Sequence, residues 1–218
     1  ASDEPNSPRS GAYHFSWRES AAQAFSFGFY VPYWAMAHYP RFPSLGRFES
    51  KVFDPERWLP EYPNPAFLNR LPDDEFWAAK QVMAFTDDDI RAIVKTGRLS
   101  DPEAERYLVE CLIERRDKIG RAYFRKVLPV DRFRLENKTL FFEDLSARHG
   151  FGAVGPFAIN WRPFDNASSK AGGPVSNGAA LPATKGIWMA EISTSLRPGQ
   201  TVLVFVRNSS IVGIERTW

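Results

Sequence analysis

The residues best suited to chemistry are the charged side chains of LIERRDKIG, residues 112–120. A helix completes one turn in about 3.6 residues, so a run of five charges cannot stay on one face. The apolar positions around the run recur at i, i+3 and i+4 spacing, and this stripe passes through Arg115. Because an unpaired buried charge is very costly, we expect Arg115 to have a partner of opposite charge or several carbonyl partners.

The carboxylates that open the two preceding predicted helices are the candidate partners of Arg115: Asp73, Asp74, Glu75, Asp87, Asp88 and Asp89. We predict a structural ion pair between Arg115 and Asp87 that cross-links two helices. Two alternatives remain, an anion-binding site at Arg115 or Arg116, and exposure of the whole segment. The other charges lie at i, i+4 spacing, as in Glu114–Lys118, and predict ordinary surface ion pairs.

Metal chemistry has one candidate motif, TDDDI at residues 86–90, because hard cations prefer carboxylate oxygens. Adjacent acids at the start of a helix do not converge on one point, so we favour their pairing with the helix dipole instead. The three histidines, His14, His38 and His149, lie in separate regions without metal-ligand spacing. The sequence therefore predicts no metal and no cofactor.

Covalent catalysis has little support in the sequence. There is no G-x-S-x-G motif, phosphate loop or dinucleotide-binding fingerprint. Cys111, the single cysteine, lies within the apolar stripe of a predicted helix, so we interpret it as a small buried side chain. No catalytic residue is predicted in this chain.

The composition excludes several classes of protein. An apolar content of 44% over 218 residues is sufficient for a core. The net charge of +2, with acids mixed among the bases, argues against a general nucleic-acid binder. No apolar run approaches the roughly 18 residues of a membrane-spanning helix, so no membrane span is predicted.

Three regions differ in character. Residues 1–72 are rich in proline and aromatic residues, and we predict an extended region, the aromatic arm. Because solvated aromatic rings are costly, the arm must cover the rest of the chain, a partner, or both. We predict that it contacts a partner polypeptide through Phe25, Phe27, Phe29, Tyr33 and Trp34.

Residues 73–130 form the predicted helical unit. One helix begins at DDEFW, a second follows Thr86 as N-cap and ends at Gly97, and a third runs from Asp101 to Leu128 after a cap at Ser100.

Residues 131–218 form the predicted β-sandwich-like domain. Five segments rich in β-branched and aromatic residues predict strands, and a loop is expected at 165–185: KTLFFEDL, VGPFAINWRPF, GIWMAEIST, QTVLVFVRN and SIVGIERTW. The last two predict a hairpin. The fold class is therefore α+β, with an antiparallel sandwich or open barrel at the C-terminus.

Three segments together carry a resemblance: FDPERWLPEYPNPAF, DDEFWAAKQVMAFTDDDIRAIVKTG and SDPEAERYLVECLIERRDKIG. They resemble the C-terminal part of a group of large, exported bacterial proteins with no established activity. The resemblance covers roughly residues 45–145 and implies that a longer polypeptide precedes this chain. It also implies a vaguely kinase-like upstream part, but supplies no catalytic residue for this one.

The expected function is that of a non-enzymatic accessory or structural subunit, or a C-terminal fragment of an exported protein. It acts by protein–protein interaction, and its partner is either the upstream part of the same protein or another subunit. The expected location is the periplasm or cell surface. One alternative is the C-terminal half of an enzyme whose catalytic residues lie upstream. Another is a carbohydrate-binding β-domain using Trp161 and Trp188, although tryptophans in alternating strands are more often buried in a core.

Overall fold

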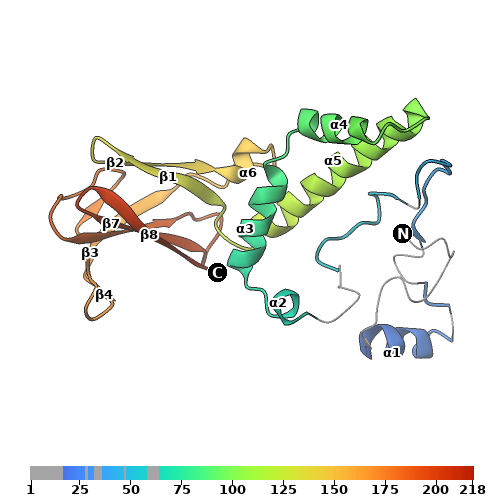
Figure 1. Cartoon of the computed structure of the whole chain (residues 1–218). Coiled ribbons are helices and arrows are strands. Elements are labelled where there is room, and N and C mark those ends of the chain that lie inside the picture. The colour runs from blue at the N-terminus through green and yellow to red at the C-terminus, as the bar shows by residue number, and fades with distance from the viewer. Residues whose placement is uncertain (1–16, 28, 32–35, 47, 58–63) are drawn as a thin grey trace. The chain divides into compact units, whose positions relative to one another are not determined.

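The computed structural model describes residues 17–27, 29–31, 36–46, 48–57 and 64–218. It contains two compact units. The first unit combines the described residues before 72 with residues 78–122, and the second combines residues 72–77 with 123–218. The helices and antiparallel sheets confirm the α+β fold class (Figure 1).

The first unit is helical. It contains α1 (Trp17–Phe25), α2 (Pro65–Leu68), α4 (Asp87–Thr96), the second half of α3 (Pro72–Met83) and most of α5 (Pro102–Phe124). Helix α1 was not predicted from the proline-rich sequence. Thr86 is the N-cap of α4 as predicted, because its side chain accepts a hydrogen bond from the Asp89 amide at 3.1 Å.

Helix α5 differs from its prediction at both ends. At the start, the Asp101 carboxylate accepts a hydrogen bond from the Glu103 amide at 2.8 Å, a capping contact predicted for Ser100. At the end, the helix stops at Phe124 instead of Leu128. Pro129 disfavours helical backbone at Leu128, and the Leu128 side chain is fully buried in the β-rich core.

The second unit holds two antiparallel sheets. Strands β1 (Val130–Glu136) and β2 (Thr139–Asp144) form one; the other has the order β4–β3–β6–β7–β8, with β5 also paired to β3. The remaining bounds are β3 (Ala158–Asp165), β4 (Lys170–Ala171), β5 (Ser176–Asn177), β6 (Ile187–Ser193), β7 (Thr201–Arg207) and β8 (Ser210–Thr217). The short helix α6 (Leu145–Arg148) follows β2. The predicted hairpin is present as β7–β8.

Three strands were missed by the sequence analysis. Strand β1 carries a register shift between Asp131 and Arg134, which breaks the alternation of apolar and polar residues that identifies a strand. Strands β4 and β5 have two residues each and lie within the segment predicted as a loop. Neither is long enough to show a periodic pattern.

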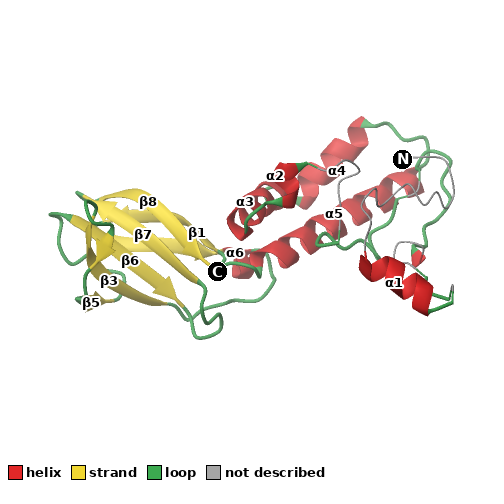
Figure 2. Cartoon of the chain, turned by 90° about the horizontal axis from the view of Figure 1, so that it is seen from below, coloured by secondary structure: helices red, strands yellow, loops and turns green. Residues whose placement is uncertain are grey.

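The two sheets enclose one core, in a sandwich-like arrangement (Figure 2). Its buried members come from both sheets and adjoining segments: Leu128, Val130, Leu140, Val154, Trp161, Leu181, Ala190, Ile192, Val202, Val204 and Val206. Backbone bonds also join the two-stranded sheet to the segment after β5, because Leu140 donates to Ala179 and Leu181 donates to Lys138. None of the helices in the described ranges is long and apolar enough to cross a membrane.

Candidate functional site

The end of α1 presents three aromatic side chains to solvent. Phe25, Phe27 and Phe29, which we call the phenylalanine cluster, are 85%, 92% and 88% exposed. The two other residues predicted for this interaction, Tyr33 and Trp34, lie outside the described residues.

Ser26 organises the turn that displays the cluster. Its amide donates to the Ala22 carbonyl at 3.0 Å, and its hydroxyl accepts from the Tyr30 amide at 2.9 Å. The next residue, Phe27, has a φ of 49°, so the backbone reverses after the helix. The backbone therefore turns at Ser26 and Phe27 after the helix, and the side chains of Phe25, Phe27 and Phe29 are exposed, an arrangement suited to contact with an apolar surface.

The charged run of α5 has a different role from the one predicted. Arg115 donates from Nε to the Glu49 carbonyl at 2.6 Å, and its Nη2 lies 3.9 Å from the Glu49 carboxylate. Its guanidinium carbon lies 4.0 Å from the ring centroid of Phe48 and 4.7 Å from that of Phe53. Burial lowers the pKa of Arg115, an effect opposed by the Glu49 carboxylate. The predicted pairing of Arg115 with Asp87 is therefore corrected to a pairing with Glu49.

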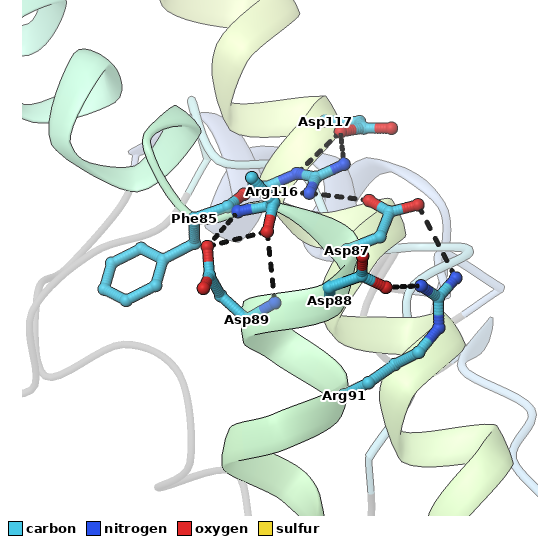
Figure 3. Close-up of polar contacts among 8 residues, drawn as sticks. Phe85, Asp87, Asp88, Asp89, Arg91, Arg116 and Asp117 are labelled. Carbon is cyan, nitrogen blue, oxygen red and sulfur yellow. Dashed lines mark hydrogen bonds and ion pairs between the residues drawn. The ribbon is translucent and has the colours of Figure 1, made fainter.

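Asp87 instead contacts the next arginine, Arg116, at 2.8 Å (Figure 3). Arg116 also donates to the Phe85 carbonyl at 2.9 Å and to the Asp117 carboxylate at 2.8 Å. Burial lowers the pKa of Arg116, but the hydrogen bonds to Asp117 and Asp87 outweigh it and raise that pKa overall. The expected cross-link between two helices thus exists, one residue further along α5. Adjacent residues differ by about 100° around a helix, so a single-position error changes the partner.

Lys118 holds the backbone of the segment at residues 48–53. Its ammonium donates to the carbonyls of Ser50, Lys51 and Phe53 at 2.6, 2.8 and 3.2 Å. The sequence analysis had assigned it to a surface pair with Glu114, whose carboxylate instead accepts a hydrogen bond from the Ser50 hydroxyl.

Tyr107 also contacts the segment at residues 48–53, because its hydroxyl donates a hydrogen bond to the Phe48 carbonyl at 3.0 Å. Burial, followed by a hydrogen bond with Cys111, raises the pKa of Tyr107 to about 12. We call Tyr107, Glu114, Arg115 and Lys118 the α5 clamp. Because its donors are engaged with the chain's own backbone, the clamp is a structural device that fixes residues 48–53 on the helix.

The acids of TDDDI, weighed above as a candidate metal motif, take part in helix capping and local pairing. Asp89 accepts from both the backbone and the hydroxyl of Thr86, at 2.9 and 2.7 Å. Asp88 pairs with Arg91 at 2.7 Å. Within the described ranges, no group of three or more His, Cys, Asp or Glu side chains is arranged to hold a metal ion.

The remaining candidate residues from the sequence are the cysteine and the three histidines. Cys111 is buried in α5. Of the histidines, His14 lies outside the described residues, His38 lies 2.7 Å from the Met36 carbonyl, and His149 lies beside the ring of Phe124.

The tryptophans of the carbohydrate-binding alternative do not form an exposed platform. Trp161 is fully buried and donates from its indole nitrogen to the Gly178 carbonyl at 2.9 Å. Trp188 packs against the same core and donates to the Lys185 carbonyl at 3.0 Å. Flat exposed rings are needed for stacking on a sugar, so Trp161 is unavailable for that role.

Sequence reasoning missed an apolar groove of about 370 Å³ in the first unit, lined by Ala84, Phe85, Asp89, Ala92 and Ile93. Phe85 and Ile93 are 49% and 53% exposed. Figure 3 shows the ring of Phe85 pointing away from Arg116. The sequence carried only a weak signal for this groove, because isolated apolar residues on a helix surface are common.

Comparisons with protein-family models, with curated proteins and with solved structures give no match to this chain.

Proposed function

We propose that this chain is a non-enzymatic accessory or structural subunit, or the C-terminal part of a longer exported protein, that acts by binding another polypeptide. The phenylalanine cluster is the observation that carries the proposal. Three large apolar side chains with more than four fifths of their surface exposed occur within five residues. Contiguous apolar patches of this kind mark interaction sites in soluble proteins.

The energetics favour a role for the cluster as an anchor. Burying one phenylalanine contributes about 1.5–3 kcal/mol, so three contribute roughly 5–9 kcal/mol before the costs of association. Val31 and Met36, which follow in the arm, are also half exposed or more. Binding energy in protein interfaces is concentrated in a few such side chains.

The partner is the upstream part of the same protein or a separate subunit, and the location is the periplasm or cell surface. Both statements rest on the resemblance of residues 45–145 to the C-terminal part of exported bacterial proteins. A fractionation of the source cells tests the location, with the chain expected outside the cytoplasm and its recovery in the cytoplasm counting against export.

The experiment that tests the function is a quantitative pull-down with the full chain as bait. Replacement of Phe25, Phe27 and Phe29 by serine should reduce recovery of the partner at least tenfold. Val212→Ser is a matched control, because Val212 is 58% exposed but lies in the β-rich unit. Unchanged recovery with the triple variant would exclude the cluster as the binding surface.

Deletion of residues 1–45 is a second test that the structure makes interpretable. It removes the cluster and the Phe42 ring that packs against Tyr107, but leaves residues 48–53 and their hydrogen bonds with the α5 clamp. The shortened chain should therefore keep its melting temperature within a few degrees while losing the partner. A shortened chain that still binds with full affinity would contradict the proposal.

A further inference from the structure

The apolar groove has the features required to accept an aromatic side chain. Four of its five lining residues are apolar, and the fifth, Asp89, places a carboxylate at the groove. Hydrogen bonds from Thr86 lower the pKa of Asp89, so the carboxylate is charged at neutral pH. The groove is shallow and largely open to solvent, with a volume of about 370 Å³.

One segment of the aromatic arm, between Glu19 and Glu49, has the complementary chemistry. Residues 20–48 contain no Asp or Glu, and their two permanent charges are Arg41 and Arg47. The phenylalanine cluster within this segment supplies three exposed rings. A segment with aromatic rings and only positive charges fits an apolar groove that carries a negative charge, because the rings are desolvated while the charges attract each other.

We propose that the partner of the phenylalanine cluster is the apolar groove of a second copy of this chain. The inference rests on the proposed function, because it specifies the polypeptide that the arm binds. Every copy carries one cluster and one groove, so the contact is head-to-tail. Such contacts join copies into rings if the rotation closes and into open chains if it does not.

The groove of a second copy is favoured over the groove of the same chain, because the structure leaves both the phenylalanine cluster and the apolar groove exposed. The cluster side chains are 85–92% exposed, and Phe85 and Ile93 in the groove are about half exposed. If the arm folded into the groove of its own chain, the cluster side chains and the groove residues would be buried.

The test uses light scattering and sedimentation velocity on the full chain over a range of concentrations. The wild-type chain should form dimers and larger species whose population rises with concentration. Two variants should each be monomeric, with association weakened by roughly 100-fold or more. One is the triple serine variant of the cluster, and the other is Ile93→Glu, which places a second negative charge and a polar group in the groove.

Mixing the two variants provides the sharper test. The triple variant keeps an intact groove and Ile93→Glu keeps an intact cluster, so one contact can form between them. An equimolar mixture should therefore form a dimer that stops at two copies. Leu68→Glu is the matched control for the groove variant, because Leu68 is an equally exposed helical residue outside the groove. It should associate like the wild type.

A wild-type chain that stays monomeric to several hundred micromolar would overturn the inference, as would a mixture of the two variants that does not associate. Association that persists in the triple serine variant alone, or in Ile93→Glu alone, would also overturn the inference. The proposed function is judged separately by the pull-down, which can still show loss of a different partner in the triple serine variant. The two proposals therefore fail in distinguishable ways.

Discussion

The two units of the chain bury different kinds of side chain. The β-rich unit encloses large apolar residues, with Trp161, Phe124 and Leu128 almost fully buried. The helical unit buries mainly small or polar residues together with one face of α4. Its buried members include Glu49, Ser50, Ala79, Met83, Ile90, Val94, Ala104 and Cys111.

This difference separates two ways of holding a chain in place. Burial of apolar surface is non-directional and supplies most of the stability of a folded domain. Hydrogen bonds from charged side chains to backbone carbonyls contribute less but fix a segment in one position. The helical unit relies more on the second kind, through the α5 clamp, and leaves the phenylalanine cluster and the apolar groove exposed. We infer that its uncovered apolar surface serves binding.

The largest expected effect lies in the β-rich core. Trp161→Ala should lower the free energy of unfolding by about 3–5 kcal/mol, because it removes a fully buried ring and its indole hydrogen bond to Gly178. Denaturant unfolding followed by circular dichroism measures this change. Phe85→Ala, at a half-exposed position in the helical unit, should change stability by no more than about 0.5 kcal/mol. Similar losses of unfolding free energy in the two variants would contradict the proposed difference between the two units.

The α5 clamp should give the next largest effect. Lys118→Met keeps the aliphatic stem but removes the ammonium that donates to three carbonyls, so unfolding should become easier by about 1.5–3 kcal/mol. Lys51→Met, at an exposed position in the clamped segment, is the control and should have little effect. Equal stability of the two variants would show that the clamp does not hold residues 48–53.

The corrected ion pair predicts a smaller difference. A double-mutant cycle between Arg116 and Asp87 should give a coupling energy of about 0.5–1 kcal/mol, because the pair is partly exposed at 2.8 Å. The same cycle between Arg115 and Asp87 should give a value near zero. A larger coupling for Arg115 would restore the pairing predicted from the sequence.

The pH dependence of the α4 cap is the smallest expected effect. Hydrogen bonds from Thr86 hold the pKa of Asp89 below its usual value. A carboxyl whose pKa is lower in the folded state stabilises the fold above its unfolded pKa and loses this contribution as the pH falls through the folded value. The stability advantage of the wild type over Asp89→Asn should therefore be present at pH 6 and decrease as the pH falls and the Asp89 carboxylate becomes protonated. A difference that does not change with pH would exclude this linkage.

The sequence predicted those features that depend on neighbouring residues. Thr86 and Asp89 are three positions apart, so the capping box is visible in the sequence itself. The β7–β8 hairpin follows from two apolar strands joined at Asn208 and Ser209, which both have a positive φ. The fold class follows from these local patterns, and it was predicted correctly.

The sequence could not predict contacts between distant segments. The α5 clamp joins residues that are 59–68 positions apart, and most of its acceptors are backbone carbonyls, which have no sequence signature. Helical periodicity placed Arg115 on an inward-facing stripe, but could not identify Glu49 as its neighbour. The groove was missed for a similar reason, since its shape depends on how the end of α3 meets α4.

The central claim is that the phenylalanine cluster is uncovered in the isolated chain and is available to a partner. Hydrogen–deuterium exchange on the full chain, at a concentration where light scattering reports a monomer, tests it most directly. We expect the amides of residues 21–31 to exchange much faster than those of residues 48–53 and of strands β6 and β7, because the hydrogen bonds of α1 and of the Ser26 turn are not covered by packed side chains. Protection of residues 21–31 to the level of those strands in the monomer would mean that the arm packs on its own chain, and would contradict the claim.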